Sequence, residues 1–311
     1  ELQARACAIS ERNLALNIAS GSERQKLAYL ATLTDETDRT YSLALDGALT
    51  QAPARDLALN LLLQRKGRAL DAMTDTMSLL RRRADATETA AFDDLQAARS
   101  ELAQLVIRGP QRTSPAKHQE RIATLEAQIE KLEDDLSRRH LEFRAQSQPL
   151  TTAAIQAAIP ADATLIEFFV YRPFQAQTFP SQSFAAPRYA AYVMRHTGAA
   201  QAIVLGEVSA IDEVVEKFRQ ALSDPRRQDV KALARKVDQL VLNPLRAALG
   251  TTRQLLLSPD GALNLVPFAA LVDEQNQYLV ARYAISYLTS GRDLLRLQTP
   301  LPSKQEAVIV A

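Results

Sequence analysis

Residues Leu255–Leu271, "LLLSPDGALNLVPFAAL", decide the fold. Three leucines run into Ser-Pro-Asp-Gly, and a second apolar run follows that Pro267 interrupts. A short apolar run bounded by turn residues is typical of a buried strand. Pro259-Asp260-Gly261 predicts the turn that ends this strand, because Pro presets φ, Asp accepts local N–H bonds and Gly tolerates positive φ.

This stretch is either an active-site loop or the scaffold beside a site. A nucleophilic Ser258 would need a histidine base within hydrogen-bond reach, and the nearest histidine in the sequence is His196. Ser258 also lacks the pattern of a nucleophile elbow. We therefore predict a scaffold, in which the second run packs beneath the sheet edge through Leu265, Val266, Phe268 and Leu271.

The sequence around this stretch predicts an α/β domain over residues 150–311. Apolar runs rich in β-branched and aromatic residues alternate with amphipathic segments, which is typical of a layered sheet covered by helices. The predicted strands are 164–173, 188–196, 202–206, 253–261, 283–290 and 307–311. The predicted helices are 209–224, 229–249 and a short one that Ser290 caps.

Residues 1–148 are rich in Ala, Leu, Arg, Glu and Gln, which are strong helix formers. The predicted helices are roughly 2–20, 23–47 with Ser22 as its cap, one that begins after Pro53 and runs, bent or broken near 85–89, to Ile107, and 115–147. The paired helices suggest the end of a helical-repeat array, although no clean self-match of period 34 is present.

An antiparallel coiled hairpin, here called the arm, is predicted over residues 88–147. Its two segments share the 3-4 spacing of a narrow apolar seam, and a short loop joins them. The arm either buries this seam internally or also contacts a partner. The seam residues are Phe92, Leu95, Leu102 and Val106, facing Ile122, Leu125, Ile129, Leu132, Leu136 and Phe143, with Arg99 and Arg139 as exceptions.

Composition excludes several function classes. The formal net charge is +1, so no global field favours nucleic acid or an anionic membrane. No apolar run is long enough to span a membrane. No glycine-rich phosphate loop is present among the 9 glycines, so we predict no nucleotide cofactor. One cysteine, Cys7, allows no intrachain disulfide and fits a cytoplasmic setting.

The remaining candidate residues have ordinary structural interpretations. Cys7 is expected to be a buried apolar residue, with a reactive thiol as the alternative. His196 is expected at the surface, and His118 with Glu120 is too sparse a cluster for a metal. The basic residues are expected to form a solvated helix face, with contact to an acidic partner as the alternative. They are Arg65, Lys66, Arg68, Arg81, Arg82 and Arg83.

Taken in order, these stretches resemble the CHAT family, whose caspase-like domains follow tetratricopeptide-type helical repeats. "ERNLALNIASGSERQKLAYL" with "LLLQRKGRALD" is similar to the helical lead-in, and "TLIEFFVY" with "RYAAYVMRH" to the opening hairpin. "LLLSPDGALNLVPFAALVDEQNQYLVARYAISYLTSGRDL" is similar to the central block. The resemblance implies a fold related to caspases, gingipains and separase, and in active members a cysteine-protease mechanism with a His–Cys dyad at strand ends.

That dyad is expected downstream of a strand like 307–311, and it has no counterpart in this sequence. Cys7 lies in the helical lead-in, and the histidines are His118, His140 and His196. We therefore predict no catalytic residue and no protease activity for these residues alone. The ends of the sequence predict a piece of a longer protein, truncated within its caspase-like domain.

Two functions follow from this interpretation. In the first, the chain is the non-catalytic part of a CHAT peptidase, binds a partner or activator through its helices, and pairs with the missing half of the caspase-like domain. In the second, it is a helical-repeat adaptor with a degenerate CHAT-like module.

Overall fold

The computed structural model describes residues 1–17, 22–46, 52–68, 86–110, 114–139, 151–175 and 183–298. The chain forms two compact units. The first unit comprises residues 1–36 and 67–149, and the second comprises residues 37–66 and 150–311. The strand predicted at 307–311 and the basic run Arg81-Arg82-Arg83 lie outside the described residues.

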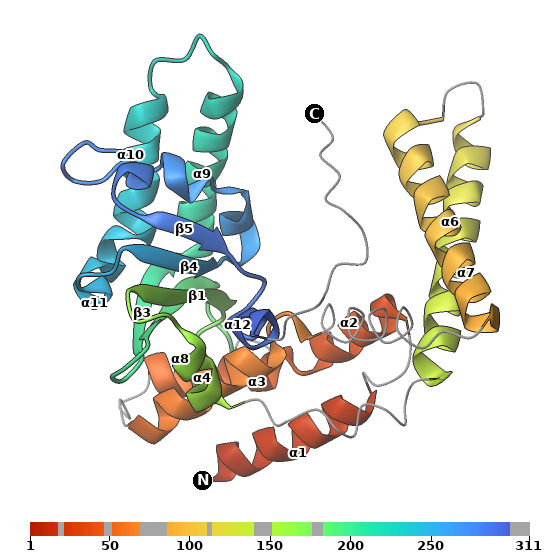
Figure 1. Cartoon of the computed structure of the whole chain (residues 1–311), viewed down its shortest axis with the longest axis horizontal. Helices are drawn as coiled ribbons and strands as arrows, with labels where there is room; N and C mark the ends of the chain where they lie inside the picture. Colours follow the sequence, from red (N-terminus) through yellow and green to blue (C-terminus); the bar gives the residue numbers. More distant parts are fainter. Residues whose placement is uncertain are drawn as a thin grey trace. The chain divides into compact units, whose positions relative to one another are not determined.

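The first unit is helical, as the composition predicts. Its helices are α1 (Leu2–Asn17), α2 (Glu23–Thr32), α6 (Ala86–Arg108) and α7 (Pro115–Arg139) (Figure 1). Ser22 caps α2 in a capping box with Gln25, which confirms the predicted cap. The single helix predicted over 23–47 is wrong, because a turn at Leu33 separates α2 from α3 (Thr34–Leu45).

Buried Glu133 of α7 links α2 to the arm. Its Oε2 accepts a hydrogen bond from the backbone N–H of Glu23 at 2.8 Å, and its Oε1 accepts one from Arg99 at 2.6 Å. Glu133 is 5% exposed, so these bonds satisfy a carboxylate that would otherwise be costly to bury. Arg99, an exception to the apolar seam, therefore serves as the partner of this carboxylate.

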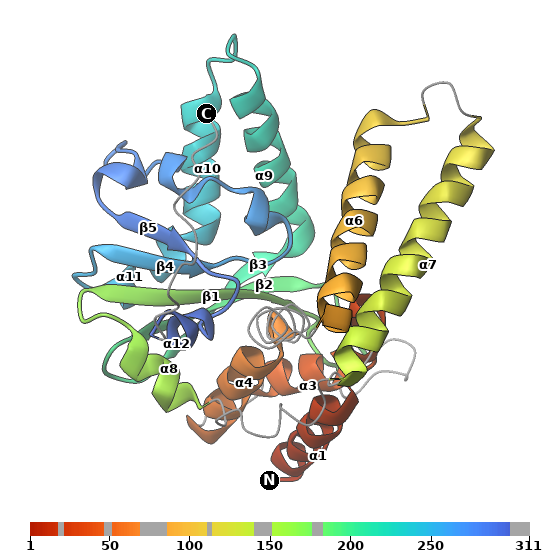
Figure 2. The same cartoon turned by 45° about the vertical axis from the view of Figure 1, so that its right-hand side comes forward.

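The arm is a helical hairpin of α6 and α7 (Figure 2). Leu95 and Leu125 are each 1% exposed, and Leu95 packs with Ile129 and Leu132, which confirms this part of the seam. Val106 is 61% exposed, so its predicted place in the seam is wrong. The apolar spacing continues in the last turn of α6, but no buried cluster forms there. The side chains of Phe92 and Leu136, and all of Phe143, lie outside the described part.

The second unit is an α/β structure built on a five-stranded sheet of order β3-β2-β1-β4-β5. Strand β1 pairs antiparallel with β2 and parallel with β4, and β4 pairs parallel with β5. The strands are β1 (Ala163–Tyr171), β2 (Arg188–Arg195), β3 (Gln201–Glu207), β4 (Gln254–Ser258) and β5 (Ala284–Tyr287). All five strands predicted within the described residues are confirmed, and the chain is helical first and α/β afterwards.

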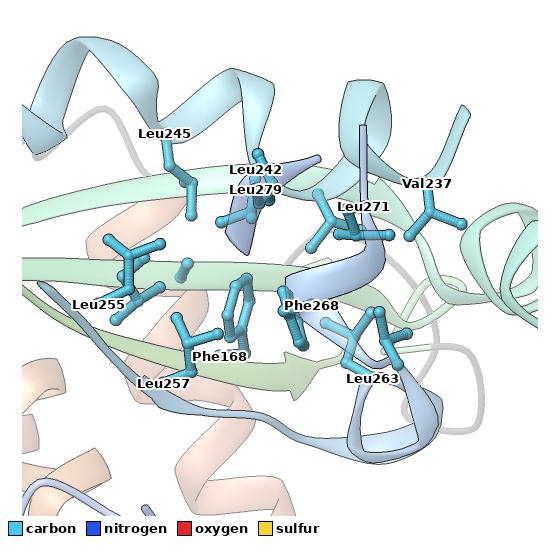
Figure 3. Packing of buried hydrophobic residues seen from close by; sticks show 14 of the residues in the cluster. Phe168, Val237, Leu242, Leu245, Leu255, Leu257, Leu263, Phe268, Leu271 and Leu279 are labelled. Carbon is cyan, nitrogen blue, oxygen red and sulfur yellow. The ribbon is translucent and has the colours of Figure 1, made fainter. Parts of the chain in front are cut away.

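Three α-helices and a set of 3₁₀ turns cover one face of the sheet (Figure 2). At the centre of this layer, Phe168 of β1 packs against Phe268, with ring centroids 5.7 Å apart (Figure 3). Residues of α10 such as Val237 pack on the side of this layer away from the sheet (Figure 3). The elements of this face are α9 (Val208–Ser223), α10 (Val230–Val241), η3 (Asn243–Leu245), α11 (Arg246–Leu249), η4 (Gly261–Leu265), η5 (Phe268–Ala270) and η6 (Leu279–Ala281).

The opposite face of the sheet is covered by helices from both parts of the sequence. They are α3, α4 (Ala52–Arg65), α8 (Thr152–Ala158) and α12 (Asp293–Leu297). Tyr41 of α3 packs on Phe169 with ring centroids 4.7 Å apart, and Leu62 of α4 belongs to the same cluster. The sequence prediction placed α3 and α4 in a helical region ending at 148. The structure instead groups residues 37–66 with the sheet, because their apolar side chains cover a face of β1 that would otherwise be exposed.

The two edges of the sheet differ in construction. On edge strand β3, the register shifts opposite Tyr189 and Ala190, and Gly206 has a φ of +141°. Such a bulge is one way in which proteins block further strand pairing. Strand β5 has neither bulge, proline nor charged residue in its sequence Ala-Ile-Ser-Tyr, and no described strand pairs with its outer side.

Candidate functional site at the carboxyl edge of the sheet

Strands β1, β4 and β5 are parallel, so their carboxyl ends meet at one edge of the sheet. In open α/β sheets this edge is where ligands bind and catalytic groups are placed. The edge is therefore the first place to look for a site. Here Glu167 of β1 lies opposite Ser258, the last residue of β4.

A buried ammonium group joins these strands from the end of α4. Lys66 Nζ donates to Glu167 Oε2 at 3.0 Å, to the carbonyl of Phe168 at 2.7 Å and to the carbonyl of Ser258 at 2.7 Å. A lysine ammonium has three donors, and all three are used. The side chains of Lys66 and Glu167 are 13% and 1% exposed. We call Lys66, Glu167, Ser258 and Gly291 the Lys66 network.

Glu167 extends the network to the loop that follows β5. Its Oε1 accepts a hydrogen bond from the backbone N–H of Gly291. A Cβ at Gly291 would lie 2.7 Å from Leu165 Cδ2 and 3.0 Å from Glu167 Oε1, so a larger residue here would displace these side chains. Arg292 adds a second connection, since its Nη1 donates to the carbonyl of Gln64 in α4 at 3.4 Å.

Ser258 is a structural residue and not a nucleophile in this arrangement. Its side chain is buried, and Oγ donates to the carbonyl of Thr289 at 2.9 Å. His196 follows β2, which is antiparallel to β1, so it lies at the opposite edge of the sheet, near Thr164. It is exposed, as predicted, and its Nδ1 lies 2.8 Å from the carbonyl of Ile159. Ser258 and His196 therefore form no dyad.

The predicted turn Pro259-Asp260-Gly261 also holds the end of β1. Asp260 Oδ1 accepts from the N–H of Gly261, and Oδ2 accepts from the N–H of Val170 at 2.9 Å. Strand β4 ends before it could pair with Val170. The Asp260 carboxylate accepts the hydrogen bond from Val170 instead. Gly261 has a φ of +53°, which confirms the reason for glycine here.

Tyr189 supports the segment after this turn. Its hydroxyl donates to Asp212 Oδ1 at 2.8 Å and accepts from the N–H of Ala262 at 3.0 Å. Burial, together with the hydrogen bond to Asp212, raises the pKa of Tyr189 above its usual value. This tyrosine stays neutral and joins β2, α9 and η4.

The second apolar run forms part of the core, as predicted, with one exception. Val266, Phe268 and Leu271 are buried, whereas Leu265 is 57% exposed. The prediction for Leu265 is wrong because residues 261–265 form a 3₁₀ helix, which directs only part of its side chains to the sheet. Tyr287 of β5 accepts a hydrogen bond from the N–H of Phe268 at 2.9 Å and fixes this segment to the edge strand.

The other candidate residues do not gather at this edge. Cys7 is buried at 3% exposure in α1 of the first unit, which confirms the expected burial. His118 and Glu120 lie on α7, and within the described ranges no group of His, Cys, Asp and Glu is arranged to hold a metal ion. None of the helices described is both long and apolar enough to cross a membrane.

The expected solvated basic face is wrong for two of its members. The Lys66 side chain bonds to β1 and β4. Arg65 is 8% exposed, and its guanidinium donates a hydrogen bond to Thr37. Their partners come from β1, β4 and α3, which are remote in the sequence. A run of basic residues at a helix end gives no sign of such partners, so local charge patterning predicted the wrong environment.

Sequence reasoning missed Glu167 and Gly291. One signal for Glu167 was available, because a single carboxylate interrupts the apolar run "TLIEFFVY" and a buried strand needs a cation for it. Gly291 follows the predicted cap Ser290, and the sequence predicts it only as the first residue of the short helix. Its contact with Glu167 spans 124 positions and has no local signature.

The network has no free reactive group among the atoms described. The ammonium is saturated, and each Glu167 oxygen has a donor. Such an arrangement positions strands and a loop, and it neither transfers protons nor attacks a substrate. In the stretch at 255–271, Ser258 takes part in these contacts, and Val266, Phe268 and Leu271 lie in the core.

Comparison with protein families gives a match over part of the chain. Residues 231–311 match the family model of the CHAT domain. The match begins in α10 and includes β4, the turn, the 3₁₀ segments, β5 and α12. It confirms the resemblance to the CHAT family over this part of the chain. Comparison with curated proteins gives no match.

Proposed function

We propose that this chain is the scaffolding and regulatory part of a CHAT-type, caspase-like cysteine peptidase. In this proposal the catalytic His and Cys come from polypeptide downstream of Ala311. The helical unit receives a partner or activator, and the sheet supports the protease half. The observation that carries the proposal is the CHAT match at 231–311, a range that contains neither cysteine nor histidine.

The geometry of the carboxyl edge supports this role. The edge is held rigid by buried polar contacts, as a support for catalytic groups must be. Ser258, whose hydroxyl lies at the end of β4, is committed to Thr289. The outer side of β5 offers backbone groups to a further strand, and exposed Tyr287 lies beside it.

The first test compares residues 1–311 with the full reading frame that contains them. Both proteins are incubated with a fluorogenic peptide pool and with a thiol-directed activity probe. We expect no turnover from residues 1–311. From the full protein we expect turnover that the downstream Cys→Ala abolishes.

Cys7→Ala is the matched control. Because Cys7 is buried in α1, this variant of the full protein should retain its turnover and its probe labelling. A reading frame without a downstream strand-end His and Cys contradicts the proposal. So does turnover by residues 1–311 that Cys7→Ala removes.

A second candidate function is that of an interaction adaptor with an inactive CHAT-like module. It is favoured by Val106 and Ile107, which are 61% and 84% exposed in the last turn of α6. Exposed apolar residues at the end of an arm suit a protein contact. Binding of a partner that Ile107→Asp abolishes, in a full protein that no probe labels, would favour the adaptor over the peptidase.

A further inference from the structure

The Lys66 network lies where the chain passes from one unit to the other. Helix α4 ends at Arg65, and the second unit's first segment ends at Lys66. Gly67, with a φ of +72°, begins the segment that belongs to the first unit. The chain therefore enters the helical unit directly after Lys66, whose side chain bonds to the strands at the carboxyl edge.

Three hydrogen-bonded routes connect the end of α4 with the loop at 288–292. Lys66 holds Glu167, and Glu167 accepts the N–H of Gly291. Arg292 reaches back to the carbonyl of Gln64 at 3.4 Å. Lys66 also bonds the carbonyl of Ser258, whose hydroxyl donates to Thr289 in the same loop. The loop and the end of α4 therefore share their polar partners.

Withdrawal of Lys66 would leave several buried groups unsatisfied at once. Glu167, at 1% exposure, would lose its counter-ion, and two strand carbonyls would lose a donor. Leaving a buried charge unpaired is among the most costly changes in a folded protein. Glu167 would then be driven to reorient toward another donor or solvent, and this change would weaken its bond to Gly291.

We propose that Lys66 is a positioning residue that couples α4 to the loop at 288–292, so that a displacement of α4 at the unit boundary alters the carboxyl edge of the sheet. The regulatory meaning of this coupling rests on the proposed peptidase role. The coupling itself does not, and it can be measured on residues 1–311 without any activity.

The test is hydrogen exchange of the intact chain, measured by mass spectrometry. In Lys66→Met we expect exchange at 288–292 to rise about tenfold or more, although these residues are over 200 positions away in the sequence. Peptides from α9 and α10 should keep their rates, because they contact the other face of the sheet. Lys217→Met, which removes a 56%-exposed lysine on α9, is the matched control and should change neither region.

Coupling must be reciprocal, which gives a second arm to the test. Gly291→Ala places a methyl group against Leu165 and Glu167, and should raise exchange at the end of α4, residues 62–68. A purely local defect would leave α4 protected.

Besides unchanged protection of α4 in Gly291→Ala, three results would overturn the proposal. The first is faster exchange near α4 in Lys66→Met with wild-type rates at 288–292. The second is an equal rise in α9 and α10, which indicates general loss of stability. If Lys66→Met does not fold, the coupling is tested instead by native-state hydrogen exchange of the unaltered chain in low urea. Residues 62–68 and 288–292 should then open with one common urea dependence, and separate openings are the third contrary result.

Discussion

The close contact between Gly261 and Tyr189 limits which residue type can occupy position 261. Gly261 has a φ of +53°, and a Cβ there would lie 2.5 Å from the Tyr189 hydroxyl oxygen. That hydroxyl also holds the N–H of Ala262. The glycine is therefore required twice, once by its backbone conformation and once by the close approach of the tyrosine.

Gly261→Ala should lower the free energy of unfolding by about 2–4 kcal/mol, which combines backbone strain with overpacking. Gly198→Ala is the control, because Gly198 also has positive φ but a Cβ there would meet no atom within 4 Å. Urea unfolding followed by far-UV circular dichroism should show the larger loss for Gly261→Ala. Equal losses would mean that the tyrosine contact contributes nothing.

At the residue scale, local chemistry could be predicted and long-range partners could not. The turn at Pro259, Asp260 and Gly261 forms through local contacts, so its sequence was sufficient to predict it, whereas the bond from Val170 to Asp260 was not predicted. Lys66 and Glu167 are 101 positions apart, and nothing near either residue identifies the other. The network at the candidate site was missed for that reason.

At the scale of elements, the arm shows how far an apolar period determines packing. The spacing correctly predicts two paired helices. Leu95 is 1% exposed, while Val106, three turns further along α6, is 61% exposed. A repeat of apolar residues therefore identifies the helix pair, whereas the extent of contact depends on the approach of the partner helix.

Leu95→Ala should destabilise the arm by about 2–4 kcal/mol, because it removes a fully buried side chain and leaves a cavity. Ile107→Ala, at a position 84% exposed, should have almost no effect. The loss of protection in both variants is measured by native-state hydrogen exchange of peptides from α6 and α7. Similar protection in the two variants would show that the cluster around Leu95 does not hold the arm together.

At the scale of the whole molecule, four tyrosines of the second unit are almost fully buried and have raised pKa values. Tyr41, Tyr171, Tyr189 and Tyr192 are each at most 4% exposed. Burial raises the pKa of every one of them above the usual value. The neutral form is therefore the one compatible with the fold.

Because the raised pKa values link folding to proton binding, the free energy of unfolding should fall at high pH. In the unfolded chain these groups ionise near pH 10, and in the fold they ionise at higher pH. The stabilisation is complete below about pH 10 and is lost as pH rises beyond it. Urea unfolding at pH 8–11.5 should show this decline, and Tyr192→Phe should make it shallower. Ionisation of all tyrosines near pH 10 with the fold retained would contradict the prediction.

The division of the molecule was the feature that sequence predicted least well. The change in composition near Pro149 correctly separates helical from α/β sequence. It does not separate the folded units, because α3 and α4 cover the sheet face around Phe169. Helix propensity reports local conformation, whereas membership of a unit depends on which apolar surfaces meet.

The Lys66 network also sets an order of events during synthesis. Lys66 leaves the ribosome before every one of its partners, and Gly291 follows it by more than 200 residues. At roughly 5–20 residues per second, α4 waits about five seconds or more for β1 and about ten seconds or more for Gly291. During that interval its apolar side is available to chaperones, and the sheet face around Phe169 reaches its native cover only after translation has passed the loop at 288–292.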